Sequence, residues 1–333
     1  MLAPKQRRLL MALGCVLTSG VVAGCDRSTP SALDPSGPKS DLVATSWWIL
    51  FSVAAAVCIL VTVLAVVPML LRRRRRQVKG GDGKRFVMIC GIILPGLVLM
   101  ATFALSVTDI ATDASPPRPS RMTIDVIGHR WWWEVRYQGS AAVTANEIHV
   151  PVGTPVQLRL QTADVIHSFW VPEVMPKMDL LPKRVNETWL SVSRPGTYRG
   201  QCAEYCGLQH AHMAFLVVAQ PRADFDTWLG RQAQDAPQPT TAEAQRGLSV
   251  LTQSSCATCH TVRGTSATGD IGPDLTHVGG RQRLAAGAIP NDFGHMSGWV
   301  ANSQTVKPGN IMPPQHLSPE DLRAVVTYLQ GLG

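Results

Sequence analysis

The apolar positions of this 333-residue chain form long uninterrupted runs in its first third and short alternating patterns afterwards. Residues 46–71 carry no charged side chain over 26 positions, and residues 86–108 carry none over 23. Each run is long enough to cross a hydrocarbon core of about 30 Å as an α-helix. From residue 120 the apolar positions recur at a period of two, which is typical of half-buried strands. The pattern predicts a two-span membrane hairpin (46–108) followed by a β-rich domain.

A basic and then apolar segment at the start of the chain is typical of a signal peptide. Three basic residues precede an apolar run over residues 9–23, which ends in Val22-Ala23-Gly24-Cys25. This ending resembles a lipoprotein cleavage box. We therefore expect removal of residues 1–24 and lipidation of Cys25, with residues 25–45 as an exported N-terminal segment. The alternative is an uncleaved anchor in which Cys25 has no role.

The net charge of +8 is concentrated in this apolar third. Residues 1–108 carry 13 Lys and Arg against 4 Asp and Glu, whereas residues 109–235 carry 12 against 13 and residues 236–333 carry 6 against 6. Arg72–Arg76 lie between the two runs, as expected of a cytoplasmic loop under the positive-inside rule. Everything after residue 109 is therefore expected outside the cytoplasm. A nucleic-acid partner is not expected, because neither later domain has the basic surplus that such a face requires.

Residues 120–221 read as an all-β domain, because turn residues separate short segments of alternating hydrophobicity. Seven short strands in about 100 residues are typical of a sandwich or barrel. The strands are expected at 122–128, 131–137, 146–150, 155–161, 186–192, 197–202 and 213–219.

One loop of this domain combines thiol, imidazole and thioether groups. Cys206, His210 and Met213 have the spacing of a blue-copper loop, and His167 can supply a second imidazole from an earlier segment. Cys202 is then an additional thiolate, four residues before Cys206. Two thiolates can bridge two copper ions with one imidazole on each. The alternative is a Cys202–Cys206 disulfide, which would leave the His and Met spacing unexplained.

The segment from Cys202 to Met213 resembles the C-x-E-x-C-x-x-x-H-x-x-M signature of the dinuclear CuA centre in cytochrome oxidase subunit II. The resemblance covers about residues 40–220 and includes the Asp-Val-Ile-His-Ser, Lys-Met-Asp and Gly-His-Arg-Trp-Trp-Trp segments at 164–168, 177–179 and 128–133. It implies a cupredoxin-like Greek-key barrel. It also implies two bridging cysteines, one histidine on each copper, two weak ligands and a magnesium ion shared with subunit I. The positions are Cys202 and Cys206, His167 and His210, Met213 and the carbonyl of Glu204, and the Glu204 side chain supported by Asp179.

The roles of three further positions stay open. His212 is expected on the surface or beside the ligands. Trp131 resembles the tryptophan that admits electrons in the family, although three consecutive tryptophans on a strand are also ordinary core. In the family a glutamate guarding a proton path opens the second span, but Met88 occupies that position here. Proton input would then be supplied by Asp82, by another subunit or by a reorganised path.

A C-terminal domain is expected over residues 242–333, behind a linker at 222–241 whose last ten residues contain two prolines. Cys256-Ala257-Thr258-Cys259-His260 is a haem-attachment motif, with Cys256 and Cys259 as thioether anchors and His260 as proximal iron ligand. The sixth ligand should be a thioether, which raises the potential. Met312 lies in a Met-Pro loop that resembles class I cytochromes c, and we prefer it to Met296 and to the remaining histidines of the domain, His277, His295 and His316.

Signals for the starts of helices predict that this C-terminal domain is small and mostly helical. Thr240–Glu243 reads as a capping box. Ser318 followed by Pro319 reads as the start of the last helix. Gly272–Leu275 is expected on the proximal side of the haem, and Tyr328 and Leu329 should pack the last helix against the first.

Together these features predict the electron-input subunit of a proton-pumping cytochrome c oxidase in a bacterial inner membrane, with both domains on the periplasmic side. A soluble cytochrome c or a bc-type complex would reduce the haem, and CuA would pass electrons to subunit I, with subunit III as a further partner. Nitric oxide or nitrous oxide reductases and a free-standing electron-carrier lipoprotein are the alternatives. A quinol-oxidase subunit is disfavoured, because such subunits lack the copper ligands.

Overall fold

A computed structural model of the chain describes residues 30–70, 80–116 and 118–333. The predicted leader, Cys25 and the basic residues 72–76 lie outside the described residues. Residues Ser31–Gly333 form one compact unit, in which a helical hairpin precedes a β-domain and a helical domain. The prediction of a membrane hairpin, an all-β cupredoxin-like domain and a small helical domain is confirmed.

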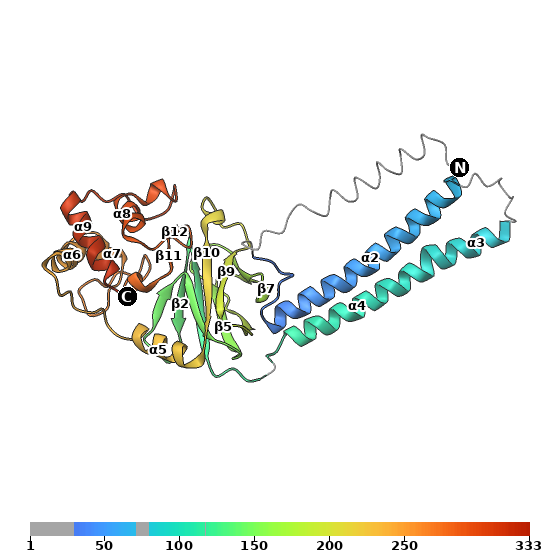
Figure 1. Ribbon diagram of the computed structural model, residues 1–333, viewed down its shortest axis with the longest axis horizontal. Helices are drawn as coiled ribbons and strands as arrows, with labels where there is room; N and C mark the ends of the chain where they lie inside the picture. The colour runs from blue at the N-terminus through green and yellow to red at the C-terminus, as the bar shows by residue number, and fades with distance from the viewer. Residues whose placement is uncertain (1–29, 71–79, 117) are drawn as a thin grey trace. The chain divides into compact units, whose positions relative to one another are not determined.

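Two long apolar helices form the hairpin. The first is α2 (Pro38–Leu70), and the second consists of α3 (Gly80–Met88), a π-helical turn (Ile89–Ile93) and α4 (Leu94–Asp113). Helices α2 and α4 lie side by side (Figure 1), and each helical segment is long and apolar enough to cross a membrane. The start of α2 and the end of α4 extend past the apolar runs that predicted them, because these polar ends are held against the β-domain.

A buried lysine joins the hairpin to the β-domain. Lys39, in the first turn of α2, places its Nζ 3.2 Å from Asp113 Oδ2 at the end of α4 and 3.0 Å from Thr188 Oγ1. The same Nζ lies 4.8 Å from the centre of the Trp189 ring, and Trp189 Nε1 donates to the Asp113 carbonyl. A buried charge needs such partners. These contacts tie the start of α2 and the end of α4 to one strand, which contains Thr188 and Trp189.

The β-domain is a sandwich of two five-stranded sheets, with strand orders β3-β2-β1-β5-β8 and β4-β10-β9-β6-β7. Strands β1 and β5 run parallel, as do β4 and β10, so the chain crosses between the sheets. The strands are β1 (Thr123–His129), β2 (Trp132–Tyr137), β3 (Val143–Ala145), β4 (Glu147–Pro151), β5 (Val156–Thr162), β6 (His167–Val171), β7 (Met175–Leu180), β8 (Asn186–Leu190), β9 (Gly196–Cys202) and β10 (Ala214–Gln220).

Three fully buried aromatic rings fill the core between the sheets. The rings of Phe169 and Phe215 stack 4.4 Å apart, and Trp133 meets both edge-on at 5.8 and 5.2 Å. Trp133 comes from one sheet, and the two phenylalanines come from the other. Such contacts fix both sheets in a single arrangement, because aromatic pairs have preferred geometry as well as large buried area.

The prediction of seven strands was incomplete, because within residues 118–221 the structure has ten. It missed β3, β6 and β7. Strand β6 was missed because four of its five side chains are buried, so its apolar positions do not alternate. Its first residue, His167, is nevertheless the one that sequence reasoning selected as a ligand.

The first half of the expected linker at 222–241 is helical. Helix α5 (Arg222–Gln232) occupies that part and packs on the β-domain through Phe225, which is fully buried. Trp228 stacks on the ring of His149 at 3.9 Å. The residues from 233 to 241 contain no further helix or strand.

The C-terminal domain is mostly helical, as predicted. It contains α6 (Ala242–Gln253), α7 (Cys256–Cys259), α8 (Phe293–Ala301) and α9 (Pro319–Gln330), with a small hairpin of β11 (Arg283–Leu284) and β12 (Ile289–Pro290) that was not predicted. Ser318 caps α9 by accepting from Asp321 N, as expected. Helix α6 is capped by Thr241, which accepts from Ala244 N, so the predicted capping box is shifted by one residue and lacks its reciprocal glutamate.

Helices α6 and α9 cross at a glycine. A Cβ atom at Gly247 would lie 2.0 Å from the carbonyl oxygen of Ala324. We predict that Gly247→Ala destabilises the C-terminal domain by about 1–3 kcal/mol, because the added methyl forces the helices apart. Gly230→Ala in α5 is the control: its Cβ meets nothing within 4 Å, so it should not destabilise the protein. Proteolysis of the full chain in detergent at increasing urea concentration measures both. An unchanged midpoint for Gly247→Ala would contradict this contact.

Candidate metal centre and haem pocket

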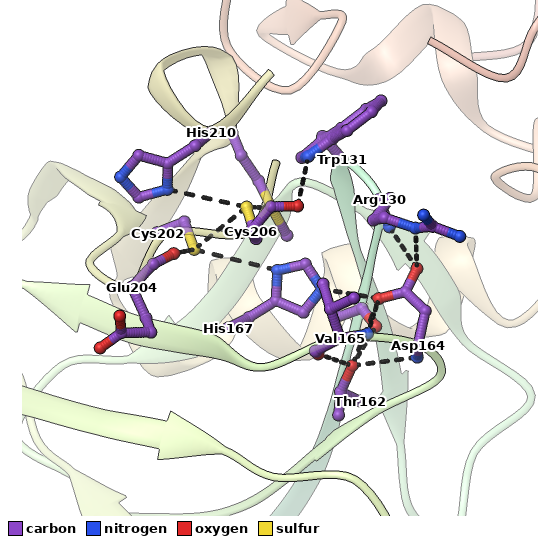
Figure 2. Close-up of polar contacts among 12 residues, drawn as sticks. Arg130, Trp131, Thr162, Asp164, Val165, His167, Cys202, Glu204, Cys206 and His210 are labelled. Carbon is purple, nitrogen blue, oxygen red and sulfur yellow. Dashed lines mark hydrogen bonds and ion pairs between the residues drawn. The ribbon is translucent and has the colours of Figure 1, made fainter. Parts of the chain in front are cut away.

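Two thiols and two imidazoles meet at one end of the sandwich. The sulfurs of Cys202 and Cys206 lie 3.8 Å apart. His167 Nδ1 is 3.9 Å from the sulfur of Cys202, and His210 Nδ1 is 3.6 Å from that of Cys206. Figure 2 shows one imidazole beside each sulfur. His167, Cys202 and Cys206 are buried, and their ligand atoms lie within 4.8 Å of one another. The sequence analysis had selected these four residues.

Two weaker donors flank this cluster. The sulfur of Met213 lies 3.8 Å from the sulfur of Cys206. The carbonyl oxygen of Glu204 lies 3.2 Å from the sulfur of Cys202. All six predicted donors are therefore close together. Both cysteines are free, and their separation is nearly twice a disulfide bond length of about 2 Å. Thiolate, imidazole and thioether groups are soft or borderline ligands, which suits copper or zinc better than magnesium or calcium.

The strands hold these donors in place. Cys202 ends β9, pairs with Phe169 across β6, and donates its backbone N–H to the Met213 carbonyl at 2.9 Å. The loop between β9 and β10 is thus closed at its base by a backbone hydrogen bond. Gly128 faces the ring of His167, where a Cβ would lie 2.8 Å from the nearest ring carbon. Only a glycine leaves room for the imidazole there.

Asp164 orients the imidazole of His167, a role that sequence reasoning missed. Its Oδ1 lies 2.8 Å from His167 Nε2, and its Oδ2 accepts from the backbone N–H of Arg130 at 2.7 Å (Figure 2). Burial opposes ionisation, but these hydrogen bonds lower the pKa of Asp164 to about 2. An ionised Asp164 keeps the proton of His167 on Nε2, so Nδ1 is free to face a metal ion. The signal available in the sequence was its place at the start of the Asp-Val-Ile-His-Ser segment, three residues before His167.

The two thiols influence each other. The hydrogen bond with Cys206 lowers the pKa of Cys202 to about 3, and the same contact raises the pKa of Cys206. Sulfurs this close cannot both carry a negative charge without a cation between them. A metal ion held by the two sulfurs would supply that charge and favour loss of the remaining proton.

The carboxylates expected at a magnesium site contact a lysine in this structure. Lys177 Nζ lies 2.9 Å from Asp179 Oδ1 and 4.0 Å from Glu204 Oε2. Asp179 also accepts from Ser168 Oγ at 2.7 Å, next to His167. His212 is exposed and contacts Gln209 Oε1 instead of a sulfur.

Trp131 lies against the metal-binding loop. Its Nε1 donates to the carbonyl oxygen of Cys206 at 2.9 Å, and its side chain is buried. A Cβ at Gly207, whose φ is +114°, would lie 3.0 Å from the Trp131 ring. Trp131 therefore belongs to the core, which is one of the two roles considered for it from the sequence. It also contacts the candidate ligand residue Cys206.

The haem-attachment motif lines a cavity formed mostly by the C-terminal domain, with Trp131 of the β-domain on its wall. Cys256, Cys259 and His260 lie on its wall together with Met296 and Met312. His260 Nδ1 contacts the carbonyl oxygen of Pro273 at 2.8 Å, within the predicted proximal segment, which leaves Nε2 available to an iron ion. Burial lowers the pKa of His260, so its imidazole is neutral, as a metal ligand must be.

The walls of this cavity fit a porphyrin. A Cβ at Gly272 would lie 2.5 Å from the His260 ring, so this segment packs directly on the proximal imidazole. Arg281 also lines the cavity, and its buried Nε has no hydrogen-bond partner among the described residues. The Nη2 of Arg281 donates to the Asp274 carbonyl, but the buried Nε–H still needs an acceptor. Haem carries two propionates that can provide one.

Known proteins share these features. Residues 141–220 match the family model for the periplasmic domain of cytochrome c oxidase subunit II, and residues 244–333 match that for cytochrome c. Cytochrome c oxidase subunit 2 of Alkalihalophilus pseudofirmus is 35% identical over 240 residues, which cover 71% of this chain and 69% of the relative. That of Bacillus sp. PS3 is 31% identical over 72% of this chain and 70% of the relative.

Among solved structures, the periplasmic domain of subunit II of cytochrome oxidase from Bradyrhizobium japonicum is similar, at 29% identity and a TM-score of 0.33. The match covers 34% of this chain and 94% of that chain. The two relatives decide the classification, since each is more than 30% identical and is matched over more than two thirds of both chains. The chain belongs to the cytochrome c oxidase subunit 2 family and carries a cytochrome c domain at its C-terminal end.

Proposed function

We propose that this subunit relays electrons from haem c in its C-terminal domain to a dinuclear copper centre in its β-domain, and onward to the oxygen-reducing subunit I. One observation supports this most: two free thiols lie 3.8 Å apart, each with an imidazole Nδ1 beside it. A mononuclear site needs only one of these thiols. The arrangement instead offers two equivalent half-sites that share both sulfurs.

In this proposal Cys202 and Cys206 bridge the copper ions, and His167 and His210 bind one ion each. Met213 and the Glu204 carbonyl are weak ligands. When bound, the copper pair takes up and releases one electron at a time. The protein contributes a rigid loop: the base is closed by a backbone hydrogen bond, and Met213 is 1% exposed, so water is kept away.

Haem c would be anchored to Cys256 and Cys259, with His260 and Met312 as axial ligands. Two observations support Met312 over Met296. Met296 is 1% exposed, and its sulfur lies 3.5 Å from Gln330 Nε2. Met312 is only half-buried and is held at the cavity by its backbone, whose carbonyl accepts from Ser303 Oγ at 2.7 Å.

The partners follow from the same assignment. Glu204 and Asp179 would bind magnesium at the contact with subunit I, where a divalent cation would displace Lys177 from both carboxylates. Subunit III completes the complex, and a soluble cytochrome c or a bc-type complex reduces the haem. Oxygen reduction on subunit I would be coupled to proton pumping.

The hairpin would lie in a bacterial inner membrane with both folded domains on the periplasmic side, as the match to a periplasmic domain supports. Cys25 would carry a lipid anchor after removal of the leader. The proposed organisation is a signal peptide, an exported segment, a hairpin, a copper domain, a connecting segment and a cytochrome c domain over 1–24, 25–45, 46–108, 120–221, 222–241 and 242–333.

Met88 stands where the family's proton-path glutamate is expected. Its side chain is exposed on the second helix, and between residues 83 and 108 the helix contains only two charged residues, Lys84 and Arg85, and no acid. We propose that protons reach subunit I by another path.

The purified oxidase complex should show c-type haem absorption together with the near-infrared band and EPR signal of mixed-valence copper. Cys206→Ser should abolish both copper signals and leave haem c absorption intact, because it removes one of two bridging sulfurs. Metal analysis should then find less than two copper ions per chain. Zinc in place of copper in the unmodified protein, or oxygen consumption replaced by nitric oxide consumption, would contradict the proposal.

Asp164→Ala should weaken copper binding by roughly 10–100-fold, because the imidazole of His167 loses the acceptor that orients it. Competition with a copper(I) chelator measures the affinity. Asp226→Ala is the matched control: it removes an exposed carboxylate that pairs only with Arg222 in helix α5. Equal copper affinities of the two variants would show that Asp164 does not support the site.

A further inference from the structure

The cytochrome c domain has a single lysine, and its side chain is buried. Residues 242–333 contain one lysine, Lys307, and its side chain is 3% exposed. Its Nζ donates to the backbone carbonyl oxygen of Trp131, 176 positions earlier in the copper domain, at 2.8 Å. Burial lowers the pKa of Lys307 to about 7, yet both forms of the amine keep an N–H to donate. The contact therefore does not depend on the titration of Lys307.

The residues after Lys307 also touch the copper domain. The carbonyl oxygen of Pro308 accepts from Gln209 Nε2 at 2.6 Å, and Gln209 is buried next to His210. A Cβ at Gly309 would lie 2.9 Å from a methyl of Leu208. Lys307 thus contacts Trp131 of the copper domain, and the next two residues contact the metal-binding loop itself.

The same short segment is bonded to the proposed haem ligand. Asn310 Nδ2 donates to the Lys307 carbonyl at 2.7 Å, and Asn310 Oδ1 accepts from Met312 N at 2.8 Å. Lys307 N donates to the Ser303 carbonyl at 2.9 Å, and Ser303 Oγ reaches the Met312 carbonyl. The position of Met312 is therefore coupled to that of Lys307 through hydrogen bonds.

Trp131 completes the connection to the copper side. Its Nε1 donates to the Cys206 carbonyl, and it lines the same cavity as His260 and Met312. The two domains also touch at a second place, where Arg263 Nη1 donates to the carbonyl oxygen of Ala141 at 2.6 Å. If the cytochrome c domain moved freely, Lys307 would enter water each time the two domains separated. Each return would then have to remove that water from the amine, which is unfavourable.

We propose that Lys307 is a positioning residue for electron transfer. It fastens the loop carrying Met312 to the carbonyl of Trp131, so the cytochrome c domain is a docked donor to the copper centre and not a tethered one that searches for it. This inference rests on the proposed function. It adds which residue sets the distance between the two redox groups.

The test is the rate of electron transfer from haem c to copper in the intact detergent-solubilised complex, after rapid photochemical reduction of the haem. Lys307→Met should slow this step by up to roughly tenfold, because loss of one buried hydrogen bond lowers the equilibrium constant for docking by about that factor. Lys307→Arg should restore most of the rate, since arginine can also donate. Lys183→Met, an exposed lysine of the copper domain, is the matched control and should have no effect.

Two further readouts separate positioning from damage to either site. Reduction of haem c by the photochemical donor, and the copper EPR signal, should be the same in Lys307→Met and the unmodified protein. In the unmodified protein the transfer rate should not depend on solvent viscosity, whereas in Lys307→Met it should fall as viscosity rises.

A viscosity-dependent rate in the unmodified protein would overturn the proposal, as would an unchanged rate in Lys307→Met. If Lys307→Met loses its haem or copper, the viscosity measurement on the unmodified protein decides alone. Absence of haem c or mixed-valence copper signals from the unmodified complex would instead overturn the proposed function.

Discussion

Two thiol groups held 3.8 Å apart are the constraint on which the rest of this structure depends. Each sulfur makes ionisation of the other less favourable, so the pair is stable as two thiolates only with metal cations between them. A loop of this kind needs a rigid frame. Strands β6, β9 and β10 supply it, and the stacked rings of Phe169 and Phe215 fill the space beneath. The sandwich therefore serves to hold six donor atoms at one end.

The contacts around these donors extend into both neighbouring parts of the chain. Asp164 receives hydrogen bonds from His167 and from the backbone of Arg130, which precedes Trp131. Trp131 in turn contacts Cys206 and receives a hydrogen bond from Lys307. In the other sheet, Thr188 and Trp189 of strand β8 contact Lys39 and so tie the sandwich to the helical hairpin. The loop that carries the donors and the attachments of the other domains thus use different strands of one sandwich.

Sequence patterns predicted most of the architecture and missed features that depend on packing. The uncharged runs at 46–71 and 86–108 marked the two helices, and period-two segments marked most strands. Strand β6 escaped because both of its faces are buried. Helix α5 was taken for a linker because its large apolar residues, Phe225, Trp228 and Leu229, are few, and their burial depends on the neighbouring sheet.

The sequence by itself determined which atoms are available to metal and haem, because the spacing in Cys202–Met213 and in Cys256–His260 is local to one loop and one helical turn. Only the tertiary structure decided how these atoms are used. It turns Nδ1 of each histidine toward a sulfur, places Asp164 on the far side of His167, and brings Lys307 to Trp131. Such contacts depend on strand register and on packing between domains, which no local pattern encodes.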